Sequence, residues 1–293
     1  MTPSAQVAQY FITGITIGCI YALVAIGFNI IFNATGIINL AQGEFVMLGA
    51  MTMLLFSNFH LPLIIAFLLS TAAVGVLGAI FQRLIIDPLR NEGMAVLVFV
   101  TLGVSILLSG LAMFIWGKDS YRLPVMLAVK PFSFLGASLH SQSLVVMGVT
   151  LSVVALLTLF FEKTLAGQAI KACSINQMAA RLVGISPRRM VLFSFVLSAA
   201  IGAIAGMVIA PITMMEYDRG PMLCLKGFAA AVLGGLGSSA GAVLAGFMIG
   251  IFESFSAGYI SSSYKDAVAL IVLLIMLFWR PRGILGSSEE REV

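Results

Sequence analysis

Two glutamates stand in strongly apolar surroundings, where an ionisable side chain is costly. Glu44 ends the stretch NLAQGE that begins at Asn39, and Glu253 lies in the apolar run GIFES. A carboxyl group at membrane depth can line a translocation path or form part of a proton relay. It can instead serve the structure alone, by accepting hydrogen bonds from backbone N–H groups that a broken helix releases. Both interpretations apply, and the sequence predicts no Lys, Arg or His partner inside an apolar segment for either glutamate.

The other residues capable of chemistry form no catalytic or metal-binding pattern. Cys19, Cys173 and Cys224 are widely separated, whereas a metal site needs clustered ligands. His60 and His140 both fall in predicted loops, where a lone histidine is usually a solvated residue. The sequence contains no phosphate-binding loop, dinucleotide-binding glycine motif or zinc-protease motif. We therefore expect no enzymatic activity in this chain and no bound metal or cofactor, and an energy source for any transport must come from elsewhere.

The composition is that of a membrane protein. Of the 293 residues, 60% are hydrophobic and 10% are charged, against about 45–50% apolar and about 25% charged residues in soluble domains. The apolar runs are long and unbroken, as helical spans require, and do not alternate as in a β-barrel. The sequence predicts an all-α integral membrane protein. Its net charge of +4 indicates contact with anionic membrane lipid and no nucleic-acid partner.

Polar connections divide the chain into expected spans. We expect one transmembrane domain over residues 1–293, a polytopic bundle of about 8–9 spans with partly re-entrant, Gly-interrupted segments. Polar surface structure is expected at Gly117–Gln142, and an outer loop at Glu216–Lys226. The expected spans cover residues 10–32, 40–56, 63–82, 94–116, 143–161, 190–214, a hairpin of two short helices within 227–255, and 265–279.

Glycines interrupt the apolar pattern once in each half of the chain, around residues 33–44 and 227–253. Such paired interruptions point to a central translocation region, because non-helical backbone at membrane depth must be satisfied by protein or by a water-filled cavity. The predicted path residues are Asn39, Gln42, Gly43, Glu44, Gly234, Gly235, Gly237 and Glu253. Other glycines are expected to let helices approach closely, namely Gly14, Gly18, Gly27, Gly36, Gly49, Gly202 and Gly206.

One water-exposed stretch, Glu162–Arg189, indicates the orientation of the chain. Short Lys/Arg-rich segments stay on the cytoplasmic side, so counting spans from this stretch places the N-terminus outside and the C-terminus in the cytoplasm. Ser174–Gly184 is predicted to be a short amphipathic helix that Gly184 ends. Ten of the 16 basic residues then lie inside: Arg83, Arg90, Lys163, Lys171, Arg181, Arg188, Arg189, Arg280, Arg282 and Arg291.

Several separated motifs resemble the LivH-type permeases of branched-chain amino acid ABC importers. They are GITIGCIYAL at residues 14–23, GIINLAQGE at 36–44 followed by MLG at 47–49, and AAVLGGLGS at 230–238 followed by GA at 241–242. The resemblance covers nearly the whole chain in the same order. ABC importer permeases also carry a coupling helix with Glu-Ala-Ala, three residues and then Gly. Residues 178–184, MAARLVG, are similar but have Met178 in place of the acid.

The resemblance implies a permease subunit of an ATP-driven importer in a bacterial or archaeal cytoplasmic (inner) membrane. It also implies a LivM-like second permease, two ATP-binding cassette subunits, and a periplasmic or lipid-tethered substrate-binding protein. The implied cargo is a branched-chain or related amino acid, with urea, short amides or aromatic acids as alternatives. In the cytoplasmic coupling segment, residues 162–190, the implied coupling residues are Met178, Ala179, Ala180, Arg181 and Gly184.

Two functions of other classes are also compatible with the sequence. An ion-coupled secondary transporter would use Glu44 or Glu253 as a proton relay and would move its substrate without partner subunits. A membrane scaffold would contain no water-accessible path. Cysteine accessibility scanning through Gly36–Gly49 distinguishes a scaffold from a transporter.

Overall fold

The computed structural model describes residues 3–127, 132–134, 136–280 and 283–286, and helices make up most of it. Within these residues, six helical segments are long and apolar enough to cross a membrane. They are α1 (Pro3–Thr35), α3 with its π-helical continuation (Leu63–Ile86), α4 (Met94–Trp116), α5 (Ser141–Lys163), α8 (Pro187–Ile209) and α10 (Ser239–Tyr259). Three shorter apolar helices are α2 (Gln42–Asn58), α9 (Arg219–Gly234) and α11 (Lys265–Trp279). As expected, the fold is nearly all-α and contains several helices apolar enough to span a membrane.

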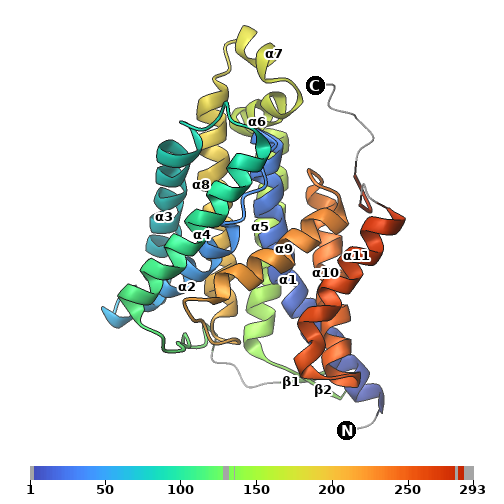
Figure 1. Cartoon of the computed structure of the whole chain (residues 1–293). Coiled ribbons are helices and arrows are strands. Elements are labelled where there is room, and N and C mark those ends of the chain that lie inside the picture. Colours follow the sequence, from blue (N-terminus) through green and yellow to red (C-terminus); the bar gives the residue numbers. More distant parts are fainter. Residues whose placement is uncertain (1–2, 128–131, 135, 281–282, 287–293) are drawn as a thin grey trace.

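The bundle is organised around α1 (Figure 1). In this view α3 and α8 lie to the left of α1, α4 crosses in front of α8, and α10 and α11 lie on the other side of α1. Two short helices, α6 (Leu165–Ile175) and α7 (Gln177–Leu182), are at the upper end of the bundle. The β1–β2 hairpin and the start of α1 are at the lower end. The basic segment and the first residues of α1 therefore lie at opposite ends.

Close helix contacts through small residues hold this centre together. A Cβ added at Gly18 of α1 would lie 2.8 Å from the Phe247 Cα atom of α10, and one added at Gly250 would lie 2.4 Å from the Gly14 carbonyl oxygen. Between α2 and α8, a Cβ at Gly49 would lie 2.3 Å from the Ala203 Cα atom. Any larger side chain would push these backbones apart. Close approach is confirmed at these positions and also at Gly27, Gly43, Gly202 and Gly206.

The expected hairpin within residues 227–255 exists, but its first helix begins earlier than the sequence suggests. Helix α9 starts at Arg219, so the second half of the expected outer loop Glu216–Lys226 is helical and Lys226 is buried. A tight turn connects α9 to α10, where Gly235 and Gly237 adopt φ values of +99° and +95°. Ser238 then caps α10 by accepting a hydrogen bond from the Gly241 N–H group, at 3.1 Å.

Surface structure at the lower end confirms the expectation for Gly117–Gln142. Strand β1 (Phe132–Phe134) pairs antiparallel with β2 (Ala137–Leu139), and Tyr121 forms a further bridge with Met215. A side chain of α1 ties the hairpin to the bundle, because the Ser138 N–H group donates to Gln9 Oε1 at 2.8 Å. Lys130, within the expected surface segment Gly117–Gln142, and the expected inner residues Arg282 and Arg291 lie outside the described residues.

The short helix expected at Ser174–Gly184 is divided by Asn176. Residues Ser174 and Ile175 belong to α6, while α7 begins at Gln177. The division is local, since Asn176 has extended backbone and its Oδ1 accepts hydrogen bonds from the N–H groups of Met178 and Ala179, both at 2.9 Å. The predicted end at Gly184 is confirmed by its φ of +84°.

Candidate functional site

The two glycine interruptions meet in the structure. Asn33 Nδ2 donates to the Gly237 carbonyl oxygen and Asn29 Nδ2 to the Ser238 carbonyl oxygen, each at 2.9 Å. The Gly237 N–H group returns a hydrogen bond to Asn29 Oδ1 at 3.1 Å. Two amides of α1 thus satisfy backbone groups that the α9–α10 turn leaves outside a helix. Asn29 is not among the residues predicted from the sequence, although an amide inside the apolar run of residues 10–32 is a usable signal.

Gln42 joins three helices at the start of α2. Its Nε2 donates to the Ser198 carbonyl oxygen of α8 at 3.2 Å, and Ser198 Oγ lies 2.8 Å from both Gln42 Oε1 and the Gly27 carbonyl oxygen of α1. The side chain is fully buried. Both ends of the Gln42 amide are therefore occupied by protein partners, and the predicted path residue Gln42 acts as a tie between α1, α2 and α8.

Glu44 lies in the first turn of α2 and is fully buried against α4 and α9. Its Oε1 accepts a hydrogen bond from Ser105 Oγ of α4 at 2.8 Å. Its Oε2 has no hydrogen-bond partner among the described residues. The backbone of α9 reaches the same oxygen so closely that a Cβ at Gly220 would lie 2.4 Å from it. Within the described part of the chain, no basic side chain forms an ion pair with Glu44.

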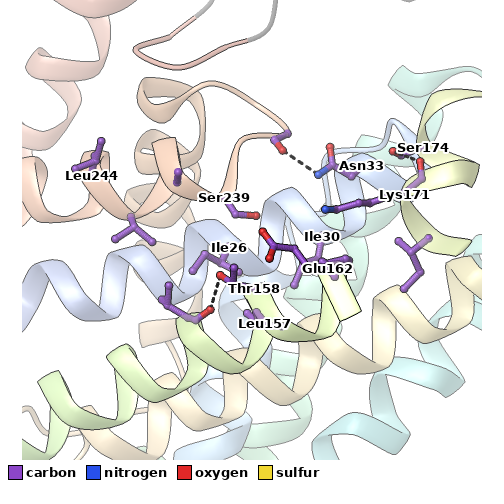
Figure 2. A pocket seen from close by; sticks show the side chains of 16 residues that line it. Ile26, Ile30, Asn33, Leu157, Thr158, Glu162, Lys171, Ser174, Ser239 and Leu244 are labelled. Carbon is purple, nitrogen blue, oxygen red and sulfur yellow. Dashed lines mark hydrogen bonds between the residues drawn. The ribbon is translucent and has the colours of Figure 1, made fainter. Parts of the chain in front are cut away.

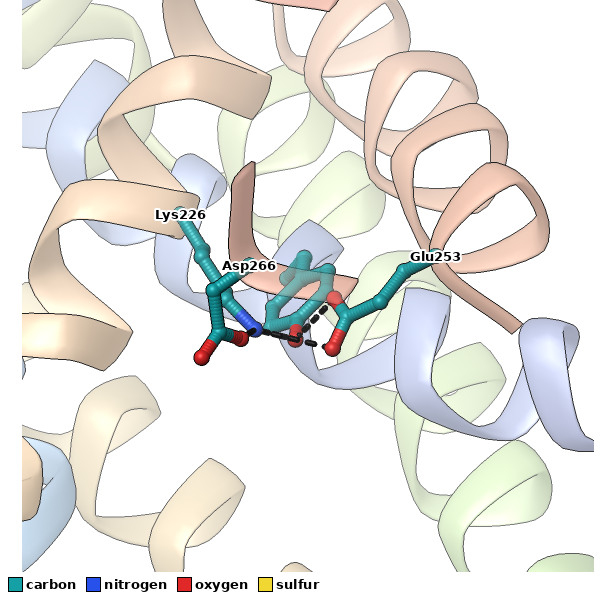
Figure 3. A network of polar contacts seen from close by, with 4 residues as sticks. Lys226, Glu253 and Asp266 are labelled. Carbon is teal, nitrogen blue, oxygen red and sulfur yellow. Dashed lines mark hydrogen bonds and ion pairs between the residues drawn. The ribbon is translucent and has the colours of Figure 1, made fainter. Parts of the chain in front are cut away.

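Glu253 lies in a polar network between four helices (Figure 3). Its Oε2 accepts a hydrogen bond from the Tyr21 hydroxyl of α1 at 2.7 Å, and its Oε1 pairs with Lys226 Nζ of α9 at 2.8 Å. Lys226 also contacts Asp266 Oδ1 of α11, at 2.5 Å. The Lys226 and Glu253 side chains are only 7% and 4% exposed. Here the expectation of glutamates without an intramembrane basic partner is wrong, because α9 begins early enough to bury Lys226.

The remaining predicted path residues are turn and contact positions. Gly234 and Gly235 end α9, and residues 283–286 pass beside them, since the Ile284 N–H group donates to the Leu233 carbonyl oxygen at 2.8 Å and the Leu285 N–H group to the Gly234 carbonyl oxygen at 3.0 Å. Asn39 is fully buried in the connection before α2. Among the described residues, the Glu44 and Glu253 carboxylates share no hydrogen-bond or ion-pair partner, so the two belong to separate polar clusters.

Helix α7 presents an apolar surface to water. Met178, Leu182 and Val183 are 73%, 85% and 75% exposed, whereas Ala180 is buried at 3%. The predicted coupling residues Ala179, Arg181 and Gly184 are exposed as well. Backbone hydrogen bonds from Gly184 to Arg181 and from Ile185 to Ala180, both 3.0 Å long, close the end of α7 in a Schellman motif. The exposed surface is therefore held in a defined shape.

The same segment is joined to the membrane helices by side-chain contacts. Gln177 Nε2 donates to the Ala34 carbonyl oxygen, at 3.3 Å, in the last turn of α1. Arg188 at the start of α8 pairs with Asp87 in the connection between α3 and α4. Ala34 is next to Asn33, which binds the α9–α10 turn. Contacts thus run from α7 through the end of α1 to the turn that joins α9 and α10.

A cavity of about 670 Å³ opens beside that turn, between α1, α5, α6 and α10. Apolar residues such as Ile26, Leu157 and Leu244 line one part of it. Asn33 and Lys171 are among the polar residues at the end toward α6 (Figure 2). The cavity is therefore lined by both apolar and polar residues, and it extends toward α6 in the basic segment.

Residues 10–277 match the protein family described as branched-chain amino acid transport system, permease component. The chain belongs to this family. It is 31% identical to the high-affinity branched-chain amino acid transport system permease protein BraD of Pseudomonas aeruginosa, and 32% identical to LivH of Escherichia coli, in each case over 97% of both chains. It is also 28% identical to the E. coli permease LivM, over 94% of this chain and 70% of LivM.

Membership confirms the resemblance that the sequence motifs indicate. The relatives are transport permeases, and the family match covers the helices from α1 to α11. This chain is accordingly a multi-pass permease protein. Similarity to LivM as well as to LivH shows that two named permeases of one transport system share this sequence pattern.

Proposed function

We propose that this chain is the LivH-like permease subunit of an ATP-driven ABC importer for branched-chain amino acids. The observation that carries the proposal is the identity of 31–32% along 97% of both chains to permeases named for that transport. A second, LivM-like permease would complete the path, since LivM is itself a relative. The path would run through the glycine-interrupted region where Asn33 meets Gly237.

Two ATP-binding cassette subunits would bind at α7 and hydrolyse the ATP. The exposed apolar side chains of Met178, Leu182 and Val183 support this, because an apolar patch rimmed by polar residues commonly marks a protein-binding surface. A helix whose end is closed by a Schellman motif can transmit a displacement without unwinding. The cytoplasmic coupling segment of residues 162–190 would therefore be the docking element of a transmembrane domain that spans residues 1–293.

Movement of α7 would reach the path through Gln177 and the last turn of α1. Because Ala34 accepts from Gln177 and Asn33 donates to Gly237, a shift of α7 displaces both the end of α1 and the α9–α10 turn. Rigid helices that move about such contacts are the usual basis of alternating access. Coupling in this chain would thus be carried by contacts between rigid helices.

In the proposed orientation, α6 and α7 face the cytoplasm of a bacterial or archaeal cell and the start of α1 faces outward. The basic residues of Glu162–Arg189 support this side assignment. A periplasmic or lipid-tethered binding protein would approach the end with the β1–β2 hairpin. Counting α2, α9 and α11 with the six long segments makes nine crossings of the bundle.

The test is reconstitution of this chain into vesicles with its second permease, both ATPases and the binding protein. Uptake of labelled leucine, isoleucine or valine that requires ATP is the expected result. Uptake of urea, a short amide or an aromatic acid in place of these would overturn the assignment of branched-chain amino acids as the cargo. Uptake by this chain alone, driven by an ion gradient, would overturn the ABC importer and favour a secondary transporter.

A further inference from the structure

We propose that Glu44 receives the ammonium group of the transported amino acid, with the hydroxyls of Ser105 and Ser109 on α4 completing the site. The inference rests on the proposed function, because it assigns one contact to the cargo on its path. It starts from a difference between the two buried glutamates. Glu253 has Lys226 as a cationic partner at 2.8 Å, and Glu44 has no cationic partner among the residues described.

A buried carboxylate without a cation is costly. Glu44 lies at the start of α2, where the helix dipole offsets only part of that cost. One of its oxygens, Oε2, still lacks any hydrogen-bond partner in the described chain. An ammonium group supplies both missing elements, since it is a cation with three N–H donors and no acceptor. The α-ammonium group is common to all amino acids, so this contact would serve the whole cargo class.

A row of hydroxyls on α4 faces the start of α2. Thr101 Oγ1 accepts the Leu40 N–H group at 3.2 Å, and one turn later Ser105 Oγ donates to Glu44 Oε1 at 2.8 Å. After another turn, the buried Ser109 Oγ lies beside the same carboxylate. The Glu44 carboxylate and the oxygen of a second hydroxyl therefore lie together, and both can accept hydrogen bonds from one ammonium group.

The connection that precedes α2 also contains a hydrogen-bond donor, the side-chain amide of Asn39. Asn39 Oδ1 accepts the Ala41 N–H group at 3.1 Å, while the buried Nδ2 has no acceptor within the described residues. An amino acid brings a carboxylate together with its ammonium group. The donor of Asn39 and the acceptor of Glu44 thus have the polarity that a zwitterionic cargo requires.

Helix α4 can uncover this site without disturbing the centre of the bundle. It is buried only along the stripe of Leu97, Thr101, Ser105 and Ala112, and its other positions are partly or fully exposed. The contacts that hold the centre of the bundle together are those of α1 with α8 and α10, and α4 takes no part in them. Displacement of α4 together with the nearby Gly220 backbone of α9 would open Oε2 to the cargo, so the present arrangement is the closed one.

The competing explanation is that Glu44 is a permanently protonated, purely structural acid. A Glu44→Gln change separates the two, because glutamine has the shape of the protonated acid and cannot carry the charge that an ammonium group needs. In the complete reconstituted importer we expect E44Q to assemble with its partner subunits. Uptake of leucine should fall at least about tenfold, as for loss of a hydrogen bond to a charged group. Uptake of leucine by E44Q within twofold of wild type would overturn the inference.

Two further variants keep the test valid if E44Q does not assemble. Glu44→Asp retains the charge and should keep more uptake than E44Q. Ser109→Ala removes one acceptor and should lower uptake, whereas Ser70→Ala, which removes a buried hydroxyl from α3, should not. Equal uptake by S109A and S70A would contradict the site. Absence of ATP-driven amino acid uptake by the wild-type importer would overturn the proposed function. Failure of the Glu44 site alone is a different result, because the wild-type importer then still transports the amino acid.

Discussion

Lys226 Nζ lies between two carboxylates, 2.8 Å from Glu253 Oε1 and 2.5 Å from Asp266 Oδ1. This arrangement joins α9 to both helices that follow it, and the Tyr21 hydroxyl adds a contact from α1. Removing one member of a buried ion pair leaves its partner uncompensated, which costs far more than the pair itself contributes.

The first prediction concerns this network. Lys226→Met should lower the free energy of unfolding by roughly 3–5 kcal/mol, because two carboxylates then lose their cation. Glu253→Gln should cost less, since Lys226 still pairs with Asp266, whose side chain is 37% exposed. The apparent melting temperature of the detergent-solubilised chain measures both changes. A larger loss in E253Q than in K226M would contradict this account.

The second prediction concerns the packing of α1 on α10. Gly18→Leu should prevent the close approach of the two helices, because even a Cβ at Gly18 would lie 2.8 Å from the Phe247 Cα atom. We expect misfolding, seen as aggregation of the solubilised chain by size-exclusion chromatography. Gly103→Leu on the exposed face of α4 is the matched control, since no atom lies within 4 Å of its Cβ position. A monodisperse G18L chain would show that the contact is dispensable.

The third prediction concerns the end of α7. Gly184 adopts a φ of +84° with no atom within 4 Å of a Cβ position, so a substitution there strains the backbone without creating a clash. Gly184→Val should leave membrane insertion intact and abolish both uptake and stimulation of the ATPases. Gly184→Asn should retain more activity, because asparagine tolerates this backbone conformation better. Normal uptake by G184V would exclude α7 as the coupling helix.

The fourth prediction concerns transmission from α7 to α1. Gln177→Ala removes the 3.3 Å hydrogen bond to the Ala34 carbonyl oxygen, so we expect less amino acid transported per ATP hydrolysed. Gln168→Ala is the control, because Gln168 Nε2 donates to the carbonyl oxygen of Glu162, six residues earlier, at 3.2 Å and in an exposed position. Both variants should assemble normally. A ratio of transport to hydrolysis that changes equally in both would argue against this route.

Much of the fold can be predicted from the sequence, because hydropathy and helix-ending signals act locally. Long apolar runs predict α1, α4, α5 and α8, since a membrane leaves a helix as the only single-segment way to satisfy its backbone. Gly184 ends α7 as predicted, because a positive φ is a property of one residue. The break at Asn176 is missed, although its capping hydrogen bonds reach only three residues ahead.

The same distinction between local signals and packing applies to the candidate site. That Glu44 and Glu253 lie in apolar surroundings, and that glycines interrupt the chain twice, can be read directly from the sequence. The pairing of Glu253 with Lys226, and the lack of such a partner for Glu44 among the described residues, depend on the folded arrangement of the helices. The pairing depends on where α9 begins and on how α1, α9, α10 and α11 pack. A charge is balanced by whichever groups are nearest in space, and residues far apart in the chain become neighbours only through packing.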